Sequence, residues 1–376
     1  MAERLELPLL RRLVLIGAGR ANLHVLRALS KPLVRGLEIV LIAPDRNHYS
    51  AAMYSGLVRG EYTTEMTRID VAALAERAGA RLVHSHVRLV AIGERAVHTN
   101  GGRVPFDVCS LDVEGESEGR ALPGVEAHAP PLRQMSTLPQ VRQWIEEHIA
   151  DASERFDCVI VGAGTRGVET AFILQRMLSG TRHGGVVTLV DEAQTILADA
   201  PQCRDIARGA LERAGVCFVL GMRVVEVRDD CVLLGSGASL PAKMVLWATG
   251  ASAPDFITAS ELPHDARGHL LVDDGLRAID GSPVWAAGDC AARPGAVDGH
   301  RDSTSAQARV LERALRAAVD APSSAAVRQG ARELCLLDTG DGRALMRWGD
   351  VRSHSRLAGW FKRRLDRQFV AGFAHP

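Results

Sequence analysis

The chain has 376 residues, of which 45 are basic and 45 acidic, so its formal net charge is zero. This balance gives no electrostatic reason to expect nucleic acid as a partner, and aromatic residues, at 4%, are too few for base-stacking surfaces. The length allows two or three domains with hydrophobic cores of their own. No segment approaches the ~20 apolar residues of a membrane-spanning helix. The first residues lack a signal-peptide pattern, so we expect a cytoplasmic protein.

The first predicted unit is a strand, a glycine-rich turn and a helix. Residues 13–16 are continuously apolar, as in a buried parallel strand, and residues 38–43 form the next predicted strand. The turn has Gly17 and Gly19, with Asn22 where the third glycine of a GxGxxG motif would stand. Such a turn lets the backbone approach a pyrophosphate at the helix N-terminus. The unit therefore predicts a dinucleotide site.

The same pattern recurs in the middle of the chain, between strands predicted at residues 158–161 and 186–190. Its turn has the complete set of glycines, which are Gly162, Gly164 and Gly167. The second strand ends in Asp191 and Glu192. An acidic residue there binds ribose hydroxyls and repels a 2′-phosphate, so NADH is favoured over NADPH. One glycine motif is a weak signal, whereas two in matching units favour bound dinucleotides over two turns without a ligand.

Further elements follow the second unit. The pattern predicts a helix over 203–214, short strands between 216 and 234, strands at 244–247 and 284–287, and a helix over 303–319. The first of the two later strands leads to Gly250, and the second leads to Gly288 and Asp289. In the first unit, Asp45 follows the second strand after two residues; it is either a ribose ligand or a turn residue.

The doubled glycine turn, Gly250 and the strand that ends at Asp289 resemble the two-dinucleotide-binding-domain flavoproteins of the pyridine nucleotide-disulfide oxidoreductase superfamily. The resemblance implies an α/β fold with two Rossmann-like domains, the second inserted in the first, and a small C-terminal module. It places an FAD-binding domain at 1–120 and 266–325, an NAD(P)H-binding domain at 121–265, and the C-terminal module at 326–376.

The resemblance also implies roles for single residues. The aspartate that matches Asp289 holds the ribityl chain of FAD. Glu169 matches a glutamate at the contact of nicotinamide and flavin. Residues 304–307, which end in Gln307, are similar to a segment of type II NADH dehydrogenases that borders flavin and quinone. Glu169 and Gln307 are thus the residues expected to line the reacting cofactors. Alternatively, Glu169 is an acidic residue in the first turn of a helix, and Gln307 belongs to an ordinary amphipathic helix.

A narrower resemblance covers nearly the whole chain. Residues 13–29, 54–62 and 360–369 look like the flavoprotein module that precedes selenophosphate synthetase in some bacteria, here as a stand-alone version. The chain departs from the expected pattern at residues 113–115, where Glu114 replaces a threonine of the flavin pocket. A flavin-binding regulatory protein without turnover, linked to selenium metabolism, is therefore an alternative function.

Cysteine spacing separates this chain from the thiol-dependent members of the superfamily. The seven cysteines are Cys109, Cys158, Cys203, Cys217, Cys231, Cys290 and Cys335, and they include no CxxC or CxxxxC pair. Thioredoxin and glutathione reductases need two adjacent thiols at the flavin. We expect reduced and mostly buried thiols and no metal site. Cys109 and Cys335 are the candidates for a mechanism with separated cysteines, as in sulfide:quinone reductases.

The C-terminal segment is basic and partly aromatic. In residues 357–373 the pattern groups Trp360, Phe361, Leu365 and Phe369 on one helical face. This composition fits either a helix at a membrane interface or a helix packed on the protein with a solvated basic face.

The preferred prediction is an FAD-dependent NAD(P)H oxidoreductase that passes hydride from NADH to FAD and then electrons to a quinone-like acceptor. The two cofactors carry this chemistry, and the protein supplies position and electrostatics. A soluble reductase of a protein or of a small organic acceptor is a further alternative.

Overall fold

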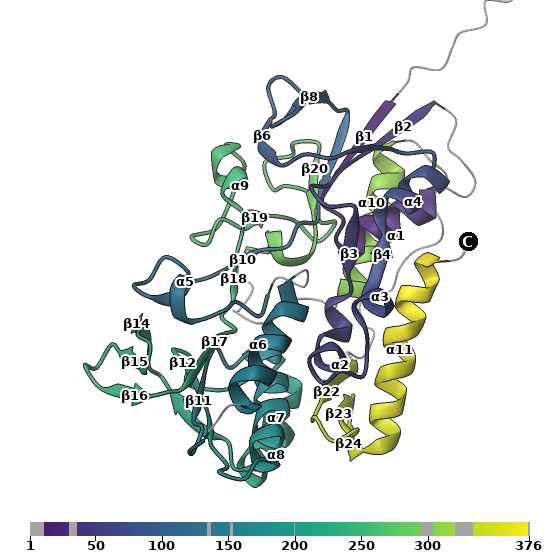
Figure 1. Ribbon diagram of the computed structural model, residues 1–376. Helices are drawn as coiled ribbons and strands as arrows, with labels where there is room; N and C mark the ends of the chain where they lie inside the picture. The colour runs from purple at the N-terminus through teal and green to yellow at the C-terminus, as the bar shows by residue number, and fades with distance from the viewer. Residues whose placement is uncertain are drawn as a thin grey trace, which may run out of the picture.

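A computed structural model describes residues 11–29, 36–133, 137–150, 153–198, 200–294, 304–319 and 334–374. Two parallel sheets with flanking helices lie one above the other in Figure 1, and a yellow C-terminal helix runs beside them. The predicted α/β class with parallel sheets is confirmed.

The first sheet has five parallel strands in the order β20-β9-β1-β2-β5. Its strands are β1 (Arg11–Ile16), β2 (Leu37–Ile42), β5 (Arg81–Val83), β9 (Val108–Leu111) and β20 (Val284–Ala286). The four residues of β1 from Leu13 onward are all buried, because the sheet is covered on both faces. Strand β20 comes from late in the chain and pairs with β9, so two distant segments complete one sheet.

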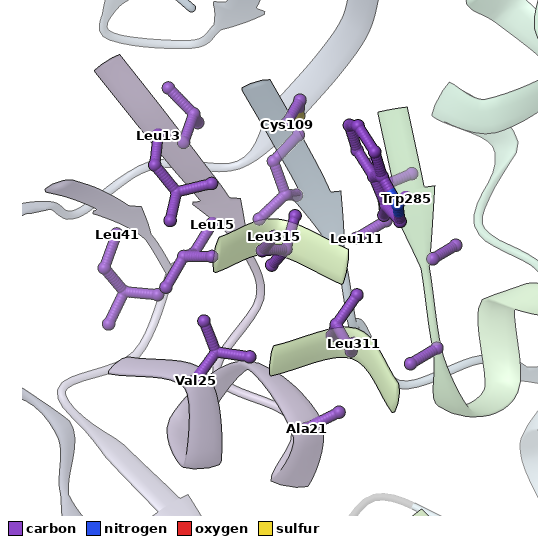
Figure 2. Packing of buried hydrophobic residues seen from close by; sticks show 14 of the residues in the cluster. Leu13, Leu15, Ala21, Val25, Leu41, Cys109, Leu111, Trp285, Leu311 and Leu315 are labelled. Carbon is purple, nitrogen blue, oxygen red and sulfur yellow. The ribbon is translucent and has the colours of Figure 1, made fainter. Parts of the chain in front are cut away.

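Two helices pack side by side on one face of the first sheet. They are α1 (Arg20–Leu29) and α10 (Thr304–Ala318). Figure 2 shows Val25 of α1 and Leu311 and Leu315 of α10 directed toward Leu15 and Leu111 of the strands. All five side chains are fully buried. The apolar residues of α10 recur at helical spacing, so one side of this helix packs on the first sheet. Helix α10 thereby lies beside α1, although these two helices are far apart in sequence.

The second sheet has four parallel strands in the order β13-β12-β11-β17. They are β11 (Cys158–Val161), β12 (Val187–Asp191), β13 (Cys217–Leu220) and β17 (Met244–Trp247). Helices α6 (Leu138–Ala150), α7 (Thr165–Ser179) and α8 (Arg204–Ala214) belong to this half of the molecule. The repeated strand–turn–helix unit of the sequence therefore forms the centre of each sheet.

Short elements connect and cover the two sheets. An antiparallel pair, β10 (Glu116–Ser117) with β18 (Ala251–Ser252), joins the segments that cross between them. Smaller sheets are β3 (Asn47–Tyr49) with β4 (Arg68–Asp70), β6 (Val87–Ala91) with β7 (Ala96–Thr99) and β8 (Gly102–Pro105), β14 (Val224–Val227) with β15 (Cys231–Leu234) and β16 (Ser239–Pro241), and β19 (Leu270–Leu271) with β21 (Ala291–Ala292). The remaining helical turns are η1 (Ala51–Met53), α2 (Tyr54–Val58), α3 (Thr64–Thr67), α4 (Val71–Arg77), α5 (Val125–His128), η3 (Pro201–Cys203), α9 (Asp255–Ala259) and η4 (Gly288–Cys290).

Residues 334–374, called the C-terminal module below, form an antiparallel sheet followed by a long helix. The sheet consists of β22 (Leu334–Asp338), β23 (Ala344–Trp348) and β24 (Val351–Ser355), and the helix is α11 (Arg356–Ala374). Figure 1 shows α11 running from this sheet past α3 toward α1. Its last turn accepts hydrogen bonds from Arg27 and Arg77 of the first half.

Two expectations about the chain are wrong. Cys203 of η3 and Cys335 of β22 form a disulfide, so not all cysteines are reduced thiols and Cys335 is not available beside a flavin. The spacing of the cysteines in the sequence did not indicate this pair, because η3 and β22 come together only in the folded chain. In addition, Cys217 is exposed and Cys231 half-buried, which departs from the expectation of buried thiols, whereas Cys109, Cys158 and Cys290 fulfil it.

The C-terminal helix packs on the protein, which is one of the two alternatives that the sequence left open for its apolar face. Of the four residues assigned to it, only Trp360 is exposed, and Phe361, Leu365 and Phe369 are half-buried. The side of α11 that faces the protein includes Lys362 and Asp366, both buried.

Candidate functional site

The first glycine turn lies where β1 and β9 end. Gly17 has a φ of 86°, which favours glycine, and a side chain there would overlap the backbone of Asp112. The N–H of Gly19 donates to the carbonyl oxygen of Asp112 at 3.0 Å. Gly17 is therefore required by the close approach of two strand ends, whereas a side chain on Gly19 would overlap only the carboxylate of Asp112.

Asn22 ties the same turn together. Its side chain is fully buried, and its Nδ2 donates to the carbonyl oxygens of Ile16 at 2.9 Å and Gly17 at 3.0 Å. The hydroxyl of Ser110 donates to its Oδ1 at 2.7 Å. A satisfied amide thus stands where the motif has its third glycine.

Asp112, which the sequence did not single out, closes the N-terminus of α1. Its carboxylate accepts the N–H of Ala21 at 2.6 Å and of Asn22 at 3.0 Å. Burial raises the pKa of Asp112 to about 7, against the effect of these hydrogen bonds. The signal available in the sequence was an acidic residue directly after a buried strand.

The predicted residues near β20 meet the first turn from the other side. Gly288 has a φ of 72°, and its N–H donates to Oε1 of Gln307 at 2.8 Å. Asp289 forms an ion pair with Arg133, which the sequence did not predict. Gly288 and its neighbour Asp289 thus lie beside Gln307.

Charged side chains gather beside Asp289. Desolvation raises the pKa of Glu114, while Arg166 and Arg133 act in the opposite direction and the nearby carboxylates of Asp289 and Asp45 add to the increase. By surface area, however, the Glu114 side chain is exposed, as is that of Asp45. The guanidinium of Arg166 donates to the carbonyl oxygen of Arg133 at 2.8 Å, which links the N-terminus of α7 to this group.

The second glycine turn repeats the geometry of the first. Gly162 has a φ of 109°, and a side chain on Gly167 would overlap the carbonyl oxygen of Gly162. Gly164 is the N-cap residue of α7 and has no side chain to cap the helix. Asp191 accepts the N–H of Ala163 at 2.6 Å, so it lies at the turn.

The two other residues predicted for the second site, Glu192 and Gly250, are exposed on the protein surface. Glu192 is exposed beside Asp191. Gly250 is also exposed, and its carbonyl oxygen accepts the N–H of Glu118 at 3.0 Å in the segment that crosses between the sheets.

Glu169 lies on α7 and contacts the C-terminal module. It is buried, and its Oε1 accepts the N–H of Asp338 in β22 at 2.8 Å. Burial raises its pKa to about 7, and the nearby Lys362 opposes this increase. The Nζ of Lys362 in turn lies 3.0 Å from Oδ2 of Asp366 and donates to Ala52 at 2.8 Å. The sequence identified Glu169 but not its partners.

The two turns offer groups that fit dinucleotides. Backbone N–H groups at a helix N-terminus bind anions, and α1 does so with Asp112. At the second turn the N-cap residue of α7 is a glycine, so it has no side chain that could cap the helix. Asp191 stands at the end of β12, where an acid binds ribose hydroxyls.

Comparisons with known proteins agree with this geometry. The chain is 27% identical over 185 residues to the internal alternative NAD(P)H-ubiquinone oxidoreductase A1 of Solanum tuberosum, which covers 44% of this chain but only 37% of the potato protein. It is 28% identical over 292 residues to an NADH dehydrogenase-like protein of Mycobacterium tuberculosis, with 75% and 73% covered. The solved sulfide:quinone oxidoreductase of Aquifex aeolicus superposes with a TM-score of 0.82 at 14% identity, over 96% of this chain and 91% of that one.

The family model for pyridine nucleotide-disulphide oxidoreductase matches residues 11–318. This range includes both sheets and both glycine turns. The chain therefore belongs to the pyridine nucleotide-disulphide oxidoreductase family.

Proposed function

We propose that this protein is an FAD-dependent NADH oxidoreductase whose electron acceptor is a quinone. The observation that carries the proposal is the pair of glycine turns, each at the carboxyl end of a parallel sheet, with Asp289 beside the first and Asp191 at the second. Family membership supports FAD and NADH as the cofactors. The names of the potato and mycobacterial relatives support NADH oxidation, and the potato name supports a quinone acceptor.

Each turn has a proposed ligand. The pyrophosphate of FAD is proposed to bind at the N-terminus of α1, beside Gly17 and Gly19, and Asp289 is suited to accept hydrogen bonds from ribityl hydroxyls. Gln307 holds the loop of Asp289 through Gly288. When bound, FAD supplies the redox chemistry, because it takes two electrons from NADH and returns them to an acceptor.

The second turn and Glu169 have proposed roles of their own. Asp191 and Glu192 favour NADH over NADPH, because a 2′-phosphate would meet two carboxylates. Glu169 is proposed to stand at the reacting end of the cofactors. Its pKa, raised to about 7, allows it to exchange a proton near neutral pH.

Anaerobic titration tests the proposal. The purified protein should show a flavin spectrum that NADH bleaches and that a soluble quinone restores. Absence of a flavin spectrum after incubation with FAD would refute it. A flavin that is bound but never bleached would instead support a regulatory flavoprotein without turnover, the alternative favoured by Glu114 in the pocket.

We also propose that the C-terminal module contacts the membrane surface where a quinone would dissolve. Its most exposed large apolar side chains are Leu357, Trp360, Trp348 and Val351, with exposed fractions of 73%, 53%, 57% and 56%. Exposed arginines at positions 352, 356 and 364 accompany them and would attract anionic headgroups. Within the described part of the chain, no helix is long and apolar enough to span a bilayer.

Flotation with vesicles of anionic and of neutral lipid separates the alternatives. The protein should float with anionic vesicles, and the double variant Leu357→Ser, Trp360→Ser should not, while keeping its NADH-dependent flavin reduction. Recovery of the unchanged protein only in the soluble fraction would favour a soluble reductase.

A further inference from the structure

The N-terminus of α1 is already occupied by an anion from the chain itself. The carboxylate of Asp112 is 4% exposed and accepts N–H groups from Ala21 and Asn22 at 2.6 and 3.0 Å. These donors belong to the first turn of the helix that follows Gly19. They are the groups that the N-terminus of such a helix offers to a phosphate.

The carboxylate also fills the space that the glycines leave open. A side chain built on Gly19 would overlap the carboxylate of Asp112, and one built on Gly288 would lie 2.6 Å from its Oδ1. Absence of a side chain at these two positions is what lets a ligand approach the backbone. Asp112 and a pyrophosphate therefore compete for the same volume and the same donors.

The second module supplies an internal comparison. The N–H of Asp112 donates to Ile16 at the end of β1, and the N–H of Ala248 donates to Val161 at the end of β11. A side chain at Gly17 would meet the carbonyl oxygen of Asp112, just as one at Gly162 would meet that of Ala248. The two residues thus occupy equivalent places, and only the first has a carboxylate.

Charges around Asp112 come from two neighbouring elements. Arg20 of α1 favours its ionised form, whereas Asp289 of η4 disfavours it. Burial is the main cause of the raised pKa of the Cys290 thiol in η4, and the nearby Asp112 adds to the increase. Burial outweighs these effects and raises the pKa of Asp112 to about 7, so a substantial fraction of Asp112 is protonated near neutral pH.

We propose that Asp112 is an internal competitor of the FAD pyrophosphate, and that flavin binding requires its carboxylate to take up a proton. A second anion at the same donors would face a like charge at close range, and neutralisation of Asp112 removes that repulsion. The inference rests on the proposed function, because it assigns FAD to the first turn. It predicts that FAD binds more tightly as the pH falls.

Titration of the flavin-free full-length protein with FAD tests this, with flavin fluorescence as the readout. The dissociation constant for FAD should rise about tenfold or more between about pH 6 and about pH 8.5. When binding requires that a carboxylate take up a proton, the affinity falls by up to tenfold for each pH unit above the pKa of that carboxyl group. Asp112→Ala, which copies the residue of the second module, should bind more tightly at high pH and lose the pH dependence. Asp112→Asn, which keeps the size of the side chain, covers the case in which alanine impairs folding.

A matched control is Asp70→Asn. Asp70 caps α4 by accepting the N–H of Ala73 at 2.9 Å, so it is a helix-capping carboxylate on a different helix. This variant should retain the pH dependence of the unchanged protein. Calorimetry in two buffers of different ionisation enthalpy should show about one proton taken up per FAD above pH 7.

Two outcomes overturn the inference in different ways. FAD affinity that is independent of pH, and equal in the unchanged protein and both Asp112 variants, refutes the competition and leaves the proposed function standing. Absence of FAD binding by every variant at every pH refutes both.

Discussion

Gly17 and Gly237 share a φ of 86°, but their surroundings differ. A side chain at Gly17 would overlap the backbone of Asp112, whereas one at Gly237 would find open space. Substitution of each residue by alanine can therefore separate the effect of backbone conformation on stability from the effect of close packing.

We expect Gly237→Ala to cost about 1 kcal/mol of unfolding free energy, the price of a left-handed residue. Gly17→Ala should cost about 3 kcal/mol or more, because overlap with a packed strand end is added, and should also abolish FAD binding. Denaturant unfolding and FAD titration measure the two effects. Equal costs for the two substitutions would contradict the close approach at Gly17.

Glu169 makes the stability of the protein depend on pH. Burial raises its pKa from 4.5 to about 7 in the folded state, so the folded protein binds this proton more tightly than the unfolded chain. Stability should consequently fall as the pH rises from about 5 to about 7, and the loss is complete above the folded pKa. Asp112 acts in the same direction.

Glu169→Gln should remove part of this decrease, since glutamine keeps an oxygen for the N–H of Asp338 and does not titrate. Thermal unfolding between about pH 5 and pH 8 measures it. The control Glu126→Gln, at a side chain that is 88% exposed, should follow the unchanged protein. A Glu169→Gln curve with the original slope would show that this carboxyl does not titrate in the range.

At the scale of elements, α11 shows how a charged residue anchors a helix. Lys362 is 7% exposed and bonds to Asp366 on its own helix and to Ala52 of η1, beside Glu169 of α7. Its apolar neighbours Leu357 and Trp360 point outward. The pattern of apolar residues did not reveal that Lys362 is buried, because Glu169 and Asp338, two of the carboxylates near it, belong to other elements.

Lys362→Met should destabilise the protein by about 3 kcal/mol, because it leaves buried carboxylates without their cation. Lys243→Met is the matched control: Lys243 forms an ion pair with Glu154 at 2.7 Å, and both side chains are more than half exposed. Such a surface pair contributes about 0.5 kcal/mol. Urea unfolding of both variants gives the comparison, and similar losses would refute an anchoring role for Lys362.

At the scale of the whole molecule, one covalent bond ties the C-terminal sheet to the second half. The disulfide joins Cys203 of η3 to Cys335 of β22, 132 positions later. A crosslink over so many residues restricts the unfolded chain strongly.

The double variant Cys203→Ser, Cys335→Ser should lose about 2–5 kcal/mol of unfolding free energy, whereas Cys217→Ser, at an exposed free thiol, should lose almost none. Denaturant unfolding measures the losses, and thiol titration of the denatured, unreduced protein should find five free cysteines. Seven reactive thiols would show that the bond does not form.

The sequence by itself determined the two strand–turn–helix units, their glycines and the acidic end of β12, because buried parallel strands and GxGxxG turns are local patterns. Through the resemblance to a family it also singled out Asp289 and Gln307, whose roles toward FAD stay predictions. It did not reveal Asp112 at the helix that follows Gly19, the pairing of Arg133 with Asp289, the burial of Lys362 or the disulfide. Each of these depends on segments far apart in the chain, and burial and charge there are set by neighbours that only the tertiary structure brings together.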